Sequence, residues 1–202
     1  MRTALSTALL LALLVPCQRA QAEGIYRYVD RDGFTVFTNI PRGGAKRAQP
    51  RAAPEGGQPS EAAALEAKPD RDEQKYDAHI AEACTLYRIP EALVRAIVAA
   101  ESNFDPQAVS ARGAKGLMQL MPETASAMFV ADVFDPKQNI LGGVRYLRIL
   151  ANMFDGDMVQ IVAAYNAGPE AVRRARGIPL IAETQEYVKR VLRLYFAYKS
   201  ES

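Results

Sequence analysis

The sequence predicts a mainly α-helical fold with a small β-hairpin on its N-terminal side. Apolar residues recur three or four positions apart through most of the chain after about residue 70, which is the spacing of one helix face. Strand patterns are nearly absent from the same part. Residues 25–39, in contrast, are rich in β-branched and aromatic residues and contain the turn dipeptide Asp32-Gly33. We therefore expect one helical unit of about 130 residues, a normal size for a domain, with a β appendage.

The first 22 residues have the pattern of a secretory signal peptide. Arg2 provides a positive charge, Ala8 to Val15 form a short apolar run, and small residues precede a cleavage point after Ala22. This pattern predicts export to the periplasm. An uncleaved anchor is disfavoured because the apolar run is too short to span a bilayer. A lipoprotein anchored at Cys17 is disfavoured because Pro16 stands where a small residue is wanted.

Two segments separate the signal peptide from the helical part. Residues 23–41 predict the β-hairpin module, which resembles a short module common in exported proteobacterial proteins. Residues 42–70 predict a flexible linker, because they contain several prolines, two Gly-Gly pairs and no apolar periodicity. Residues 71–202 form the predicted helical domain.

Caps, prolines and apolar stripes predict the helices of this domain. One helix covers residues 73–87, and the next runs from Pro90 to about Ser102. A third is expected over Leu117 to Met128 with a break near Pro122. Asp135-Pro136 opens a long helix whose stripe contains Ile140, Val144, Leu147 and Ala151. A shorter helix ends near Asn166, and a final one covers about 183–199.

Composition excludes several classes of function. The formal net charge is +2, and removal of Arg2 and Arg19 with the signal peptide leaves 23 basic and 23 acidic residues. Because there is no basic stripe, nucleic acid is not an expected partner. The chain has one histidine, His79, and no Cys/His cluster at ligand spacing, so neither a metal nor a cofactor is expected.

Glu101 is the strongest candidate for a catalytic residue. It lies four residues after Ile97 and seven after Val94, on the core-facing side of the helix that starts at Pro90. A carboxyl among apolar residues loses hydration, which raises its pKa and allows it to donate a proton near neutral pH. The alternative is a glutamate at a frayed helix end that reaches water.

Ordered motifs around Glu101 favour catalysis. Glu101-Ser102 is followed by Ser110, then by Gly116-Leu117-Met118-Gln119, by 164–169 (AYNAGP) and by Glu183-Thr184 with Tyr187. With these motifs, residues of about 75–197 closely resemble the soluble lytic transglycosylase family, whose domain is related to goose-type lysozyme. The resemblance implies a lysozyme-like helical catalytic domain.

The resemblance also implies a reaction. Glu101 corresponds to the sole catalytic carboxylate of the family, which protonates the oxygen between N-acetylmuramic acid and N-acetylglucosamine in peptidoglycan. The same carboxylate then acts as base on the muramyl C6 hydroxyl, and a 1,6-anhydro ring closes without consumption of water. A glycosidase usually needs a second carboxylate. Asp105 is nearby in sequence, but Asp-Pro after a helix is an ordinary loop signal.

Six further residues receive substrate-binding roles from the resemblance. Ser110 corresponds to a serine that contacts substrate near the glutamate, and Met118 and Gln119 to residues that line the sugar groove. Core packing is the alternative for Met118, and a solvated loop for Gln119. Tyr165 corresponds to a tyrosine whose hydroxyl contacts the carboxyl or the sugar, and Asn166 to a residue whose amide contacts an N-acetyl group. Tyr187 corresponds to a late tyrosine near the glutamate, although it also belongs to an apolar helix stripe.

Three functions are compatible with these features. The first is a peptidoglycan lytic transglycosylase of the bacterial envelope. The second is a lysozyme-like hydrolase that admits water, and the third is a glycan-binding assembly factor without catalysis. The expected partner is the peptidoglycan strand. A secretion, conjugation or pilus machine that spans the envelope is a further hypothesis, based on the linker that separates the hairpin from the helical domain.

Overall fold

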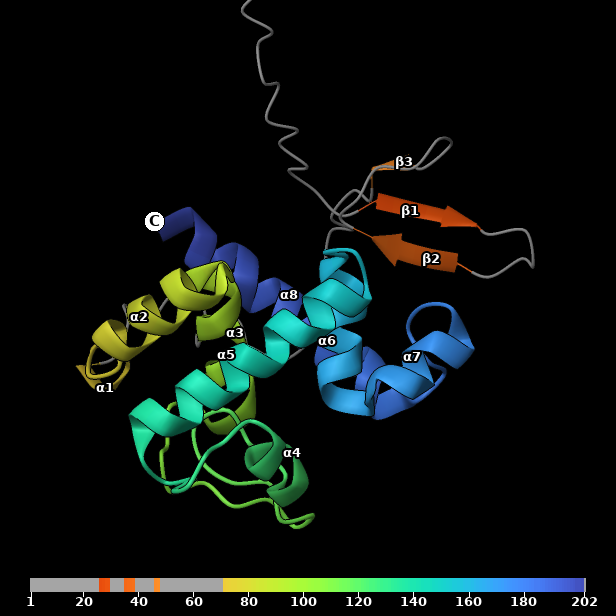
Figure 1. Ribbon diagram of the computed structural model, residues 1–202. Coiled ribbons are helices and arrows are strands. Elements are labelled where there is room, and N and C mark those ends of the chain that lie inside the picture. The colour runs from red at the N-terminus through yellow and green to blue at the C-terminus, as the bar shows by residue number, and fades with distance from the viewer. Residues whose placement is uncertain (1–25, 30–34, 39–45, 48–70, 202) are drawn as a thin grey trace, which may run out of the picture.

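The computed structural model describes residues 26–29, 35–38, 46–47 and 71–201 (Figure 1). The described part is mainly helical, as predicted. Its helices are α1 (Arg71–Gln74), α2 (Asp77–Tyr87), α3 (Glu91–Ser102), α4 (Pro122–Ala127), α5 (Pro136–Met153), α6 (Met158–Ala167), α7 (Pro169–Ala175) and α8 (Ala182–Glu201).

Three short strands precede the helices. They are β1 (Tyr26–Val29), β2 (Thr35–Thr38) and β3 (Lys46–Arg47), arranged in the order β2-β1-β3 with antiparallel pairing. The predicted turn at Asp32-Gly33, the signal peptide and nearly all of the predicted linker lie outside the described residues. The hairpin module therefore stays a prediction.

Helix α3 lies at the centre of the helical part. It packs against α8 and α2, while α5 packs against α2 and α6 against α8. The predicted stripe of α3 is confirmed, because Leu93, Val94, Ile97 and Val98 are all buried. The stripe of α5 is confirmed as well, since Ile140, Val144, Leu147 and Ala151 are buried in the same core. Because packing holds α3 in place, the orientation of its last turn, which contains Glu101, is also fixed.

Local signals set the starts of α5, α6 and α7. Asp135 caps α5, and its side chain accepts a hydrogen bond from the backbone N–H of Gln138 at 2.8 Å. Asp157 caps α6 through the N–H groups of Val159 and Gln160. Pro136 and Pro169 occupy the first turns of α5 and α7, where a missing N–H costs no hydrogen bond.

The helix predicted over residues 73–87 is interrupted. Its two parts are α1 and α2, and Tyr76 lies between them with φ −104° and ψ 0°. The Tyr76 side chain is buried and stacks on Phe104, with ring centroids 6.4 Å apart. Packing of this ring therefore overrides the helical pattern of the sequence.

The helix predicted to begin at Leu117 begins instead at Pro122. Residues 117–121 form turns, and Gln119 has a left-handed backbone with φ +47°. Lys115 and Leu120 pair across this segment as an isolated antiparallel bridge. This loop and α4 lie together at one end of the helical part (Figure 1). Among the described helices, none is both long enough and apolar enough to cross a membrane.

Candidate functional site

Glu101 occupies the last turn of α3, at the edge of the core. The helix ends one residue later, and Asn103 and Phe104 then take left-handed backbone conformations with φ of 50° and 63°. The chain therefore turns sharply away after Glu101, which leaves its side chain half-buried. Burial raises the pKa of Glu101 from 4.5 to about 7. A hydrogen bond from Tyr187 and the positive charge of Arg190 oppose this shift without cancelling it.

Tyr187 on α8 contacts Glu101 directly. Its hydroxyl donates a hydrogen bond to Glu101 Oε1 at 2.6 Å, although the two residues are 86 positions apart. The Tyr187 ring is buried, with 4% of its surface exposed. Burial and the charge of Glu101 hold the pKa of Tyr187 well above its ordinary value, so the phenol acts as a donor. Core membership and contact with the carboxyl, which the sequence left as alternatives, are both properties of this side chain.

Tyr165, near the end of α6, lies on another side of the site. Its hydroxyl donates a hydrogen bond to the backbone carbonyl of Met118 at 2.8 Å. Burial, followed by the charges of Glu101 and Tyr146, raises the pKa of Tyr165 well above its usual range. Tyr165 is therefore close enough to Glu101 for their charges to interact, and its phenol stays protonated at neutral pH.

Two residues that the sequence analysis did not select flank this group. The Tyr146 ring lies 5.7 Å from the ring of Tyr165, and the Arg190 guanidinium lies 5.8 Å from the ring centroid of Tyr187. Arg190 is three residues after Tyr187 on α8, a spacing that places both on one helix face. Tyr146 lies on α5, which packs against α6 and thereby reaches Tyr165. Neither residue can be recognised as part of the site until the packing of α5 and α8 against their neighbours is known.

The loop between α3 and α4 carries three of the predicted residues. The Ser110 hydroxyl accepts a hydrogen bond from the N–H of Ala114 at 3.0 Å and closes a turn within the loop. Gln119 donates from Nε2 to the carbonyls of Ala108 at 3.0 Å and Gly116 at 2.9 Å. Both side chains are half-buried. In this structure their hydrogen bonds maintain the shape of the loop.

The side chain of Met118 has no exposed surface and belongs to the core. The core-packing alternative therefore describes this side chain. The group that Met118 presents to the site is its backbone carbonyl, which accepts from Tyr165. The preceding carbonyl, that of Leu117, accepts a hydrogen bond from Ser102 Oγ at 2.8 Å. The loop is thus attached to α3 one residue beyond Glu101.

Asn166 is held by a residue of α8. Its Oδ1 accepts a hydrogen bond from Thr184 Oγ1 at 2.7 Å. This bond occupies the amide oxygen and sets the orientation of the amide group. The neighbouring Glu183 forms an exposed ion pair with Arg112 of the loop. Contacts between motifs far apart in sequence therefore join the loop, α6 and α8 around Glu101.

The arrangement is suited to proton transfer. Glu101 has a pKa near neutrality, and two phenols that remain protonated lie around it. Oε1 is held by Tyr187, whereas Oε2 has no hydrogen bond among the described residues. Within residues 71–201 and the described strands, no group of three or more His, Cys, Asp or Glu side chains could hold a metal ion.

Two family models match the chain. The model described as "Transglycosylase SLT domain" matches residues 78–188, a range that contains all the predicted site residues. A model described as "Domain of unknown function (DUF4124)" matches residues 9–70.

Named relatives and a solved structure agree with the first match. The chain is 40% identical over 89 residues to the "Transglycosylase" of Enterobacteria phage PRD1, covering 44% of this chain and 33% of that protein. It is 37% identical over 134 residues to the "Soluble lytic murein transglycosylase" of Escherichia coli (strain K12), covering 54% of this chain and 20% of that protein. The lytic transglycosylase Slt of Pseudomonas aeruginosa, solved as an inactive mutant with glutamine in place of a glutamate, has a similar fold. Its TM-score is 0.57 at 32% identity, over 61% of this chain and 24% of that chain.

The chain spans only a third or less of the length of these three proteins. The family match nevertheless covers more than half of this chain, and it includes Glu101, Tyr165 and Tyr187. On this basis the chain belongs to the transglycosylase SLT domain family.

Proposed function

We propose that this chain is a peptidoglycan lytic transglycosylase. It cleaves the β-1,4 bond between N-acetylmuramic acid and N-acetylglucosamine and leaves a 1,6-anhydromuramyl end. The observation that carries the proposal is the half-buried Glu101, which burial keeps partly protonated near pH 7 and which Tyr187 holds by one oxygen. Membership of the SLT domain family supports the substrate class.

Glu101 acts first as a general acid. Tyr187 occupies Oε1, so the proton is delivered from Oε2 to the bridging glycosidic oxygen. The bond between this oxygen and the anomeric carbon of N-acetylmuramic acid breaks, and the oxygen leaves as the 4-hydroxyl of N-acetylglucosamine. The anomeric carbon becomes electron-deficient, while Glu101 becomes a carboxylate that the Tyr187 hydroxyl stabilises.

Glu101 then acts as a general base. Its carboxylate removes the proton of the muramyl C6 hydroxyl, and the freed oxygen pair bonds to the anomeric carbon. This closes the 1,6-anhydro ring and restores the protonated acid. The reaction consumes no water, and a single carboxyl is sufficient for both steps. Asp105, the other acid near Glu101 in sequence, is exposed and uses its carboxyl to accept from the N–H of Gln107.

The remaining predicted residues contribute to glycan binding in this proposal. The oriented amide of Asn166 is available to an N-acetyl group, and the Tyr165 hydroxyl is held at the Met118 carbonyl. Ser110 and Gln119 border the site from a loop that their own hydrogen bonds keep in shape. Met118 contributes its backbone carbonyl, which accepts the hydrogen bond from Tyr165.

We also infer that the chain acts in the periplasm after cleavage of the signal peptide behind Ala22. In this proposal residues 23–41 form a β-hairpin module and 42–70 a linker that tethers the catalytic part to an envelope-spanning machine. Deletion of residues 23–69 tests the tether. Unchanged activity on isolated peptidoglycan would support a docking role, and a large loss of activity would contradict it.

The main experiment digests purified peptidoglycan with the protein and with Glu101→Gln, and weighs the released fragments by mass spectrometry. Anhydro products from the unmodified protein, absent with Glu101→Gln, are expected. Products one water heavier, also absent with the variant, would identify a hydrolase. No products from either protein would favour a glycan-binding assembly factor.

A further inference from the structure

Asn139 is a fully buried polar residue in the first turns of α5. Its side chain is 0% exposed and makes three hydrogen bonds to backbone groups. Its Oδ1 accepts from the N–H of Met118 at 2.8 Å. Its Nδ2 donates to the carbonyls of Lys115 at 3.1 Å and Val133 at 2.7 Å. One amide thus binds three backbone groups, of which the Lys115 carbonyl also accepts from the N–H of Leu120 at 3.0 Å.

One of these bonds, together with a bond from Ser102, fixes the loop next to the catalytic carboxyl. The peptide group between Leu117 and Met118 is held on both sides: Asn139 binds its N–H, and Ser102 Oγ binds its carbonyl. The next carbonyl, that of Met118, accepts from Tyr165 at 2.8 Å. A continuous chain of contacts therefore runs from Asn139 through the Met118 backbone to Tyr165.

The loop fits closely on α5 at two glycines. A Cβ on Gly116 would lie 2.3 Å from Asn139 Nδ2 and 2.3 Å from the carbonyl oxygen of Val133. A Cβ on Gly143 would lie 2.3 Å from the sulfur of Met118. At Gly116 the Val133 backbone leaves no room for a side chain. At Gly143 the end of the Met118 side chain fills the space that a side chain would need. The loop therefore lies in close contact with α5 at both glycines.

One face of α5 serves the site along two turns. Asn139, Gly143 and Tyr146 are four and seven residues apart, which places them on the same helix face. Asn139 binds the loop, Gly143 makes room for Met118, and Tyr146 packs against Tyr165 with ring centroids 5.7 Å apart. Both the loop and Tyr165 are thus located relative to one helix.

We propose that Asn139 is a positioning residue for the proton transfers at Glu101: by holding the Met118 backbone, it places the acceptor of the Tyr165 hydroxyl at the loop that Ser102 attaches to the last turn of α3, next to Glu101. This inference rests on the proposed function. The role requires one acceptor and two donors in a side chain of this length. An ionised aspartate would supply only acceptors and would face two carbonyl oxygens.

The test compares the unmodified protein with Asn139→Asp, Tyr165→Phe and the double variant. Initial rates of fragment release over a range of peptidoglycan concentrations give kcat and KM. Ile80→Ala is the control, because Ile80 is a core residue of α2 that belongs to none of the hydrogen bonds above. All rates are measured well below the unfolding temperature of each protein.

We expect Asn139→Asp to lower kcat by about tenfold or more with little change in KM, since one misplaced hydrogen bond to a reacting site has this size of effect. Ile80→Ala should keep kcat near that of the unmodified protein even where its melting temperature falls further. The double variant should be no slower than the slower single variant, because both changes remove the same contact chain. An unchanged kcat, a loss confined to KM, or fully additive effects would overturn the proposal.

A second readout does not depend on activity. The hydroxyl proton of Tyr165 is identified in NMR spectra by its disappearance in Tyr165→Phe. It should be lost or shifted in Asn139→Asp and retained in Ile80→Ala. Retention in Asn139→Asp would contradict the inference even if the protein proved to have no transglycosylase activity. If Asn139→Asp does not fold, Asn139→Ser is measured by the same criteria, and failure of both to fold would assign Asn139 a structural role only.

Discussion

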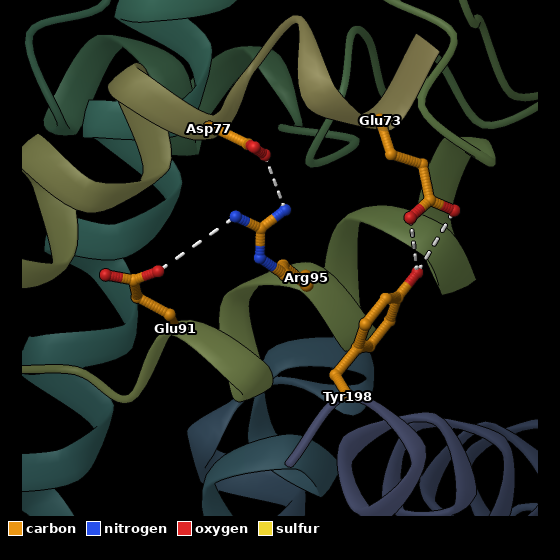
Figure 2. A network of polar contacts seen from close by, with 5 residues as sticks. All are labelled: Glu73, Asp77, Glu91, Arg95 and Tyr198. Carbon is orange, nitrogen blue, oxygen red and sulfur yellow. Dashed lines mark hydrogen bonds and ion pairs between the residues drawn. The ribbon is translucent and has the colours of Figure 1, made fainter. Parts of the chain in front are cut away.

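Helix α8 pairs a tyrosine hydroxyl with a glutamate near each of its ends, and the two pairs differ in their surroundings. Near its start, Tyr187 is buried and donates to Glu101 at 2.6 Å. Near its end, the half-buried Tyr198 lies 3.2 Å from both carboxyl oxygens of Glu73 (Figure 2). The chemical partners are the same, but Tyr187 belongs to the buried core, whereas Tyr198 packs against its edge.

At Glu101, burial and not the contact with the tyrosine makes the carboxyl an acid near neutral pH. A hydrogen bond from a phenol stabilises the charged carboxylate and therefore lowers its pKa. At Glu101 desolvation outweighs this effect and raises the pKa to about 7.

Figure 2 also shows a polar network around Arg95 of α3, which does not include Glu101. Arg95 binds Asp77 at 2.8 Å and lies 4.0 Å from Glu91, where each acidic side chain is 51% exposed. The pair with Asp77 connects α2 to α3, whereas Glu91 and Arg95 are both on α3.

The largest expected difference between the two ends of α8 is in activity. Glu101→Gln should lower the rate of fragment release by roughly 10²- to 10⁴-fold, because the amide can neither donate nor accept the transferred proton. Glu73→Gln, the same change in the other pair, should leave the rate nearly unchanged. Comparable losses in both variants would mean that burial of Glu101 does not single it out as the acid.

Removal of each tyrosine hydroxyl should give a smaller difference. Tyr187→Phe is expected to reduce the rate by about tenfold to a hundredfold, the effect of losing a hydrogen bond to a charged group. Because that bond lowers the pKa of Glu101, its loss should also move the fall in activity to higher pH. Rates measured from about pH 5 to pH 9 test this shift. Tyr198→Phe is the control, and a shift in its profile would contradict the assignment.

Stability should depend on pH at Glu101. In the folded protein Glu101 has a pKa of about 7, compared with an ordinary 4.5. Between these values the folded state binds more protons than the unfolded state, so the free energy of unfolding falls as pH rises. Glu101→Gln lacks this titration and should gain roughly 1 to 3 kcal/mol relative to the unmodified protein from about pH 4.5 to pH 8. Urea unfolding at several pH values measures the gain, and a constant difference between the two proteins would count against the raised pKa.

The smallest effect is expected at Arg95. Arg95→Gln removes an ion pair with an exposed partner and should cost roughly 0 to 1 kcal/mol of stability. Salt should reduce the difference from the unmodified protein further. Thermal unfolding at low and high salt provides the measurement. A loss of several kcal/mol, or a loss of activity, would show that this network supports the site.

The predictable parts of the molecule are those governed by local chemistry. The stripe of α3, the Asp135 cap of α5 and the proline starts of α5 and α7 follow from side chains within one or two turns of each other. These signals place Glu101 on the core-facing side of α3, and the ordered motifs around it predict the family. The break at Tyr76 and the loop at 117–121 were not predictable in this way, because each depends on packing against a distant residue.

The sequence by itself therefore determined the helical class, the position of Glu101 and several of the residues around it, although not Tyr146 or Arg190. Tertiary structure decided what these residues do to one another. It brought Tyr187 within 2.6 Å of Glu101 across 86 positions, and it buried the carboxyl enough to raise its pKa. It also turned the Met118 side chain into the core and made Asn139 a link between α5 and the loop. The physical reason is that desolvation and hydrogen bonding depend on the neighbours of a group in space, and helical periodicity specifies only which face is buried.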